Sequence, residues 1–151
     1  MGHDIKQLKP SRSSRYKQGY IDPKSCKKLF EGLANDRIIY RSSYEKDFIY
    51  WLEHSQNVHR WGSECLGIKY INVLDQKEHT YYPDYVVEMV NGDLIIIEIK
   101  PKNQTIKPKN LNCYAGHEWI RNMCKWKATK QYCESRGLQF KILTEETISR
   151  L

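Results

Sequence analysis

Apolar positions change from helical to strand spacing and back along the chain, and this pattern predicts its elements. Residues 42–54 have the spacing of an amphipathic helix, with Ser42-Ser43 as the N-cap and acidic residues in the first turn. The inward face of this helix consists of Phe48, Ile49 and Leu52. Glu45 lies on the same stripe, three and four residues before two of them. A carboxylate on a buried face needs a partner.

From residue 58 onward, β-branched and aromatic residues predict strands separated by glycine and Asp-Gln turns. Residues 101–112 form a basic loop interrupted by prolines, and the longest predicted helix, 118–136, ends at Gly137. The predicted strands are 58–61, 67–74, 80–90, 94–100 and 138–143, followed by a short helix over 145–151.

The first 35 residues have few periodic apolar positions, and only residues 25–33 suggest a short helix. We therefore expect a basic N-terminal arm over residues 1–41 and a folded core over residues 42–151. A chain of 151 residues has the length of one domain.

Charge is distributed unevenly within the overall net charge of +7. Residues 1–41 and 102–136 each have a net charge of +6, whereas residues 42–101 have a net charge of −5. Basic segments suit a polyanion such as nucleic acid, although ordinary surface lysines would give the same count. The acidic centre suits DNA only if a divalent cation lies between carboxylates and phosphate. The candidate DNA-binding residues are Arg12, Arg15, Lys102, Lys107, Lys109, Lys127 and Lys130.

Several classes of protein do not fit this sequence. The longest aliphatic run, residues 94–97, is far shorter than the ~20 residues of a membrane span, and the N-terminus lacks an apolar signal region. Five cysteines without CxxC spacing favour buried, reduced thiols over disulfides. A zinc site would have to use loosely spaced residues, an arrangement that zinc sites rarely show. These residues are Cys113, His117, Cys124 and Cys133.

The strand after the Asn91-Gly92 turn carries the most specific chemistry. Its aliphatic run predicts a central strand buried on both faces, and the period of two places Glu98 and Lys100 side by side at its end. Asp84 follows Pro83 on the preceding strand. Acidic oxygens from adjacent strands beside a lysine form a site for a hard divalent cation and a water. The alternative is an exposed strand-end ion pair worth under about 1 kcal/mol.

Pro83-Asp84, the hairpin and Glu98-Ile99-Lys100, with Glu45 on the preceding helix, resemble the motif of PD-(D/E)XK nucleases. The order of elements is most similar to the TnsA-like endonuclease domain, and the whole chain also resembles the head completion nucleases of T-even bacteriophages. These resemblances imply an α/β, restriction-endonuclease-like fold, in which helices flank a central mixed β-sheet.

The resemblance also implies roles for the site residues. Asp84 and Glu98 would bind Mg²⁺, or Mn²⁺ as a substitute, together with the backbone carbonyl of Ile99. Glu45 would add a ligand directly or through water, or hold a second metal ion. Lys100 would orient the attacking water, giving a 5′-phosphate and a 3′-hydroxyl. A basic or amide residue on the long helix would assist, either Lys130 or Gln131, although a lysine packing its stem over tryptophan is an equal alternative.

The implied function is a magnesium-dependent DNA nuclease with endonuclease and possible exonuclease activity and weak sequence preference. It would trim packaged DNA before the head joins the tail, with double-stranded DNA and phage head or neck proteins as partners and no membrane. Its location would be the host cytoplasm during assembly or the virion. Two alternatives remain: a structural joining or DNA-binding protein with an inactive nuclease fold, and a sequence-specific restriction-type endonuclease.

The hairpin presents a conflict between sequence and chemistry. A two-residue Asn91-Gly92 turn would pair Asp84 with Ile99 and leave Asp84 facing away from Glu98. A shift of one residue reverses the face. We therefore predict either a three-residue loop over residues 91–93 with a left-handed glycine, or a β-bulge between Asp84 and Val90.

Overall fold

The structure is a computed structural model, and it describes residues 5, 7–8, 18–31 and 38–151. Fourteen elements follow one another within these ranges. They are β1 (Gln7–Leu8), β2 (Gly19–Ile21), η1 (Pro23–Ser25), β3 (Ile38–Tyr40), α1 (Ser43–His54), β4 (Val58–Ser63), β5 (Ile68–Asn72), β6 (Lys77–Tyr81), β7 (Tyr85–Met89), β8 (Leu94–Ile99), η2 (Lys102–Thr105), α2 (Tyr114–Arg136), β9 (Gln139–Leu143) and α3 (Glu145–Ile148).

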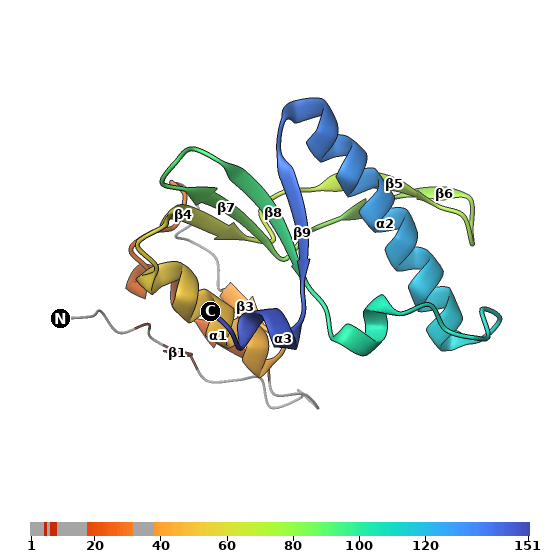
Figure 1. Ribbon diagram of the computed structural model, residues 1–151, viewed down its shortest axis with the longest axis horizontal. Coiled ribbons are helices and arrows are strands. Elements are labelled where there is room, and N and C mark those ends of the chain that lie inside the picture. Colours follow the sequence, from red (N-terminus) through yellow and green to blue (C-terminus); the bar gives the residue numbers. More distant parts are fainter. Residues whose placement is uncertain (1–4, 6, 9–17, 32–37) are drawn as a thin grey trace.

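A four-stranded mixed sheet is the centre of the fold, with the strand order β4-β7-β8-β9. Strand β8 pairs antiparallel with β7 and parallel with β9, so the aliphatic strand is interior, as its composition predicts. Figure 1 shows α1 and α2 on opposite sides of this sheet, with the β5–β6 hairpin beside α2. The predicted α/β fold with a central mixed sheet flanked by helices is confirmed.

The alternation along β8 distributes its side chains between two cores. Ile95 and Ile97 pack with the inward face of α1, including Phe48, Ile49 and Leu52, which are fully buried. Ile96 points to the other side and packs with Cys133 of α2 and with Ile68 of β5. Glu98 follows Ile96 on the α2 side of the sheet, because side chains two residues apart on a strand share a face.

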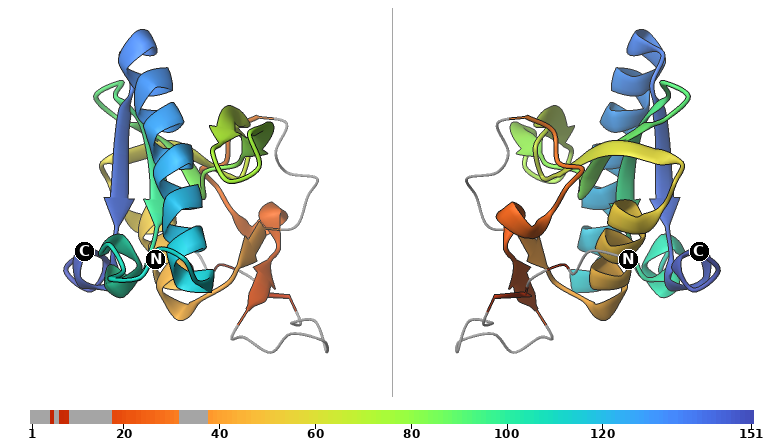
Figure 2. Two further views of the ribbon diagram at one scale, coloured as in Figure 1. Left: turned by 90° about the vertical axis from the view of Figure 1, so that its right-hand side faces the viewer. Right: turned by 90° about the vertical axis from the view of Figure 1, so that its left-hand side faces the viewer.

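The expected division into an arm and a core differs from the structure. Ile21 and Ile38 are buried in the same core as α1, and β2 pairs with β3. The buried Glu53 carboxylate accepts hydrogen bonds from the backbone N–H groups of Lys27 at 2.6 Å and Lys28 at 3.0 Å. Figure 2 shows this small N-terminal sheet beside the main body. The described residues before 41 are therefore part of the folded core.

The short helix predicted over residues 25–33 does not form in the described part of that range. The structure has the 3₁₀ turn η1 and then an isolated parallel bridge between Leu29 and Trp61. Residues 32–37 lie outside the described residues, as do Arg12 and Arg15.

The register of the β7–β8 hairpin differs from both predicted solutions and still places Asp84 on the same face as Glu98. Strand β7 pairs with β8 without a bulge, and Glu88 lies opposite Leu94. The Met89 N–H donates to the carbonyl of Asp93 at 2.8 Å, so the loop is Val90-Asn91-Gly92 rather than residues 91–93. Gly92 has φ +94°, confirming the left-handed glycine. The bulge lies instead on β4, between Val58 and Arg60. Extending the pairing by one residue places Asp84 opposite Glu98, on the same face.

Local hydrogen bonds explain this register. The Asn91 side chain accepts from the backbone N–H of Asp93 at 3.0 Å, and the Val90 N–H donates to the carbonyl of Asn57 at 2.8 Å, beside β4. An Asx interaction and the neighbouring strand thus replace the two-residue turn that the Asn-Gly dipeptide favours.

Two further expectations concern α2 and the cysteines. Helix α2 starts four residues earlier than predicted and ends as predicted at Gly137, which has φ +69°. Of the five predicted buried thiols only Cys133 is buried, while Cys65 and Cys113 are exposed. No helix in the described ranges has the length and apolar character needed to cross a membrane.

Candidate active site

Asp84 and Glu98 meet where β7 begins and β8 ends. Asp84 Oδ2 accepts a 2.7 Å hydrogen bond from the backbone N–H of Ile99, which ties the aspartate to the end of the neighbouring strand. The carbonyl of Asp84 accepts from the N–H of Glu64 at 3.0 Å. The Glu98 side chain is buried, with an exposed fraction of 9%. The two carboxylates therefore have fixed positions on one face of the sheet.

Lys100 continues the same face beyond the strand. Its Nζ lies 4.0 Å from Glu98 Oε1, and its side chain is 22% exposed. The Lys100 backbone N–H donates to the carbonyl of Leu143 at 2.9 Å, which prolongs the pairing of β8 with β9. The lysine head group is thus held beside the carboxylates, and not free in solvent.

Tyr81 is a functional neighbour that the sequence did not single out for this role. Its hydroxyl donates a short hydrogen bond to Glu98 Oε2, and its ring is buried. The structure buries Tyr81 against the site and leaves Tyr82 56% exposed.

Glu45 has structural partners just before the first residue of α1. The Ser42 hydroxyl accepts from the Glu45 N–H at 3.2 Å, and Glu45 Oε2 accepts from the backbone N–H of Arg41 at 2.5 Å. This arrangement resembles a capping box and satisfies donors at the start of the helix. The buried Glu45 thus has the partner that its position on the apolar stripe required.

The four predicted catalytic residues line one groove of about 350 Å³. Glu45 comes from α1, Asp84 from the start of β7, and Glu98 and Lys100 from the end of β8. Ile99, predicted to offer its carbonyl, also lines this groove. A second hollow, lined by Tyr81 and Lys125, adjoins the same Asp84, Glu98 and Lys100 side chains.

Burial dominates the electrostatics of the carboxylates. It raises the pKa of Asp84 to about 7, although the Ile99 hydrogen bond opposes the shift. Burial also raises the pKa of Glu98 to about 7, opposed by the positive charges of Lys100 and Lys125. The pKa of Glu45 is raised by burial as well. Removing three carboxylates from water without a full complement of positive charge favours their protonated forms, so a cation in the groove would be stabilised.

The basic residue that α2 places beside the carboxylates is Lys125, whereas the candidates from the sequence were Lys130 and Gln131. Lys125 lines the hollow beside Glu98, and its Nζ lies 5.6 Å from the centre of the Tyr81 ring. Burial lowers its pKa. Lys130 and Gln131 are exposed and line other hollows of α2 that contain none of the four site residues.

The remaining predicted DNA-binding lysines fall into two groups. Lys127 and Lys130 line a hollow between α2 and β9 that contains none of the four site residues. Lys102 is close to the groove, but its Nζ pairs with Glu146 Oε1 at 2.9 Å. Lys107 lies over the Trp119 ring with 5.6 Å to its centre, and Lys109 is exposed on the same loop.

The donor set of the groove fits a magnesium ion that keeps much of its water. Within the described ranges, no three His, Cys, Asp or Glu side chains gather closely enough to hold a metal by themselves. Mg²⁺ usually binds one or two carboxylates and completes its shell with water and substrate phosphate. Asp84, Glu98 and the Ile99 carbonyl are ligands of this kind, whereas Glu45 is engaged at the helix start and would act through water.

Comparisons with known proteins agree with this geometry. The family model described as the TnsA-like endonuclease N-terminal domain matches residues 55–145, which contain Asp84, Glu98, Lys100 and Lys125. Glu45 precedes the matched segment. The mixed sheet and the site at its strand ends thus define an endonuclease-type domain, and the chain belongs to the TnsA-like endonuclease family. It is also 36% identical over 125 residues to the head completion nuclease of Enterobacteria phage T4, a match that covers 76% of this chain and 83% of that protein.

Proposed function

We propose that the protein is a magnesium-dependent DNA nuclease that hydrolyses phosphodiester bonds at the groove between α1 and the ends of β7 and β8. The observation that supports this most strongly is the direct opposition of Asp84 and Glu98 beside Lys100. Two buried carboxylates with raised pKa values next to an ammonium group have no evident structural purpose, and such perturbed groups in a groove mark functional sites.

Each residue has a specific task in this proposal. Asp84, Glu98 and the Ile99 carbonyl hold Mg²⁺, for which Mn²⁺ can substitute. The bound ion would polarise the scissile phosphate and lower the pKa of a water. Lys100 positions that water and offsets negative charge that develops on the phosphate. Tyr81 fixes the orientation of Glu98, and Lys125 supplies a second positive charge on the α2 side.

The biological setting is proposed from the relative. The T4 protein is named a head completion nuclease, and we infer that this chain also acts in the completion of a phage head. It would trim packaged DNA before head and tail join, with phage head or neck proteins as partners. Its place of action would then be the host cytoplasm during assembly, or the virion. The proposed cleavage has weak sequence preference.

Incubation of the purified protein with DNA tests this function. With Mg²⁺ we expect cleavage of double-stranded DNA, and with EDTA none. Asp84→Asn and Glu98→Gln, which retain the shapes of the side chains, should each abolish cleavage while circular dichroism stays unchanged. If the protein binds DNA but does not cleave it with any divalent cation tested, it would instead be a joining protein with an inactive nuclease fold.

A further inference from the structure

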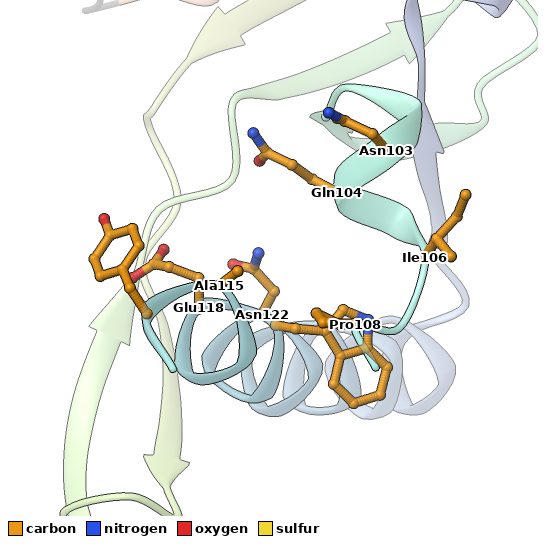
Figure 3. A pocket seen from close by; sticks show the side chains of 9 residues that line it. Asn103, Gln104, Ile106, Pro108, Ala115, Glu118 and Asn122 are labelled. Carbon is orange, nitrogen blue, oxygen red and sulfur yellow. The ribbon is translucent and has the colours of Figure 1, made fainter. Parts of the chain in front are cut away.

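A cavity of about 330 Å³ adjoins the catalytic groove, between η2 and the first half of α2. Figure 3 shows Asn103 and Gln104 on η2, and Glu118 and Asn122 on the side of α2 that faces the space between the two elements. Gln104 lines both this cavity and the groove that contains Asp84 and Glu98. The two spaces are therefore neighbours that share a wall.

The lining has the chemistry of a site for a neutral, planar ligand. Three carboxamides, Asn103, Gln104 and Asn122, offer donors and acceptors, and Tyr114 and Trp119 offer aromatic rings. Among the described lining residues the only charged side chain is Glu118, a carboxylate paired with Arg121. A phosphate would be repelled by that wall. Carboxamides pair with the edges of nucleobases, and aromatic rings stack on their faces.

Trp119 supplies an independent observation. In the described part of the chain, its indole Nε1 is the only buried side-chain nitrogen or oxygen without a hydrogen-bond partner. A buried donor without a partner is unfavourable, so an acceptor that enters the cavity would be stabilised. Asn122 is itself only 5% exposed, and asparagine side chains are seldom buried so deeply. Polar groups held ready inside a cavity indicate a ligand.

We propose that this cavity binds an unpaired nucleobase of the DNA strand whose phosphate enters the catalytic groove. This inference rests on the proposed function and adds a substrate class, namely DNA with an unpaired or frayed nucleotide next to the cut. A base inside an intact duplex cannot reach a cavity of this kind without leaving its stack. Lys107 and Lys109, on the loop that borders the cavity, would contact the flanking phosphates.

Photocrosslinking locates the base directly. A short duplex carries 5-iodouracil either at an unpaired terminal nucleotide or at a paired internal position, and is bound to the full chain in EDTA so that no strand is cut. After irradiation and trypsin digestion, we expect the unpaired base on the peptide of residues 110–121, which contains Tyr114 and Trp119. The paired base should not label this peptide. Labelling elsewhere, or equal labelling by both duplexes, would overturn the proposal.

Binding affinities of variants provide the second measurement. We expect the protein to prefer the unpaired duplex by roughly tenfold, the effect of one stacked base. Trp119→Leu should remove this preference and Asn103→Ala should reduce it several-fold. Gln131→Ala, an exposed amide on the same helix, should not change it. Because Asn103 is exposed, its variant remains informative if the Trp119 variant fails to fold. An unchanged preference in Asn103→Ala would contradict the proposal.

A third arm separates DNA from a free nucleotide. Labelling of the same peptide by free 5-iodo-deoxyuridine monophosphate, without labelling by the unpaired duplex, would overturn the DNA assignment. None of these measurements uses cleavage. A protein without nuclease activity could still show the crosslink, and an active nuclease could lack it, so the two proposals can fail separately.

Discussion

Asp84 Oδ2 accepts a hydrogen bond of 2.7 Å from the backbone N–H of Ile99, across the point where β7 and β8 stop pairing. This contact holds the aspartate against the last residues of β8 and keeps it on the face that Glu98 occupies. The same contact opposes, without cancelling, the rise in the pKa of Asp84 that burial causes. The site therefore holds charged groups at a cost to stability.

That cost predicts a pH-dependent stabilisation by Asp84→Asn. The folded state raises the pKa of Asp84 from 3.8 to about 7, so it binds more protons than the unfolded state between these values. Stability contributed by this group is therefore lost as pH rises from about 4 to about 7. Without divalent cations, we expect the variant to gain about 1–3 kcal/mol of unfolding free energy at pH 8, and less at pH 5. Denaturant unfolding at both pH values measures this, and equal effects would contradict it.

Magnesium binding should offset the destabilisation that the buried charges of Asp84 and Glu98 cause in the unmodified protein. A cation at concentration c that binds the folded state alone stabilises it by RT ln(1 + c/Kd), so the melting temperature rises with the logarithm of its concentration above the dissociation constant. At pH 8 we expect Mg²⁺ to stabilise the protein, and the effect to shrink at pH 6, where Asp84 and Glu98 are largely protonated. The double variant Asp84→Asn, Glu98→Gln is the control. A magnesium-induced shift of equal size in this control would place the ion elsewhere.

Much of this site could be predicted from the sequence because it depends on strand parity and on element order. The aliphatic run identified the central strand, and the period of two put Glu98 and Lys100 on one face. The conflict between the Asn-Gly turn and the position of Asp84 was also visible. The actual loop was not, since it depends on the contact of Val90 with Asn57, residues far apart in the sequence.

The rotation of α2 could not be predicted, and this explains the error over Lys130. Trp119, Met123 and Trp126 lie at helical spacing with Lys130, and this shared stripe is what favours Lys130 in the sequence. In the structure the buried residues of the helix include the polar Asn122 and Thr129. Hydrophobicity does not indicate that these residues turn inward, and their burial turns Lys125 toward Glu98.

Lys125→Met should therefore reduce DNA cleavage, whereas Lys130→Met should not. Methionine keeps the length and packing of the lysine stem and removes its charge. We expect a loss of about 10- to 100-fold in the cleavage rate, the usual scale for one electrostatic contact with a developing charge. Initial rates on linear DNA at saturating Mg²⁺ measure the effect. Equal rates for the Lys125 variant and the unmodified protein would exclude this lysine from the site.

Glu53→Ala tests whether the N-terminal residues belong to the core. Glu53 is buried, and besides the two backbone N–H groups before residue 30 it accepts from Trp61 Nε1 at 2.8 Å. Truncation leaves these donors unpaired, and we expect a loss of about 2–4 kcal/mol of unfolding free energy. Asp47→Ala, an exposed position of the same helix, should change it by less than about 0.5 kcal/mol. If Glu53→Ala also lost less than about 0.5 kcal/mol of unfolding free energy, the residues before 41 would be a dispensable arm.

The most direct test of the nuclease site combines cleavage with the two carboxylate variants. Supercoiled and linear double-stranded DNA are incubated with the unmodified protein, Asp84→Asn and Glu98→Gln, each with Mg²⁺, with Mn²⁺ or with EDTA. We predict that the unmodified protein cleaves DNA with either metal and not with EDTA, and that both variants are inactive although folded. Cleavage that persists in either variant, or its absence with every metal in the unmodified protein, would contradict the assignment of Asp84 and Glu98 as the metal-binding centre of a nuclease.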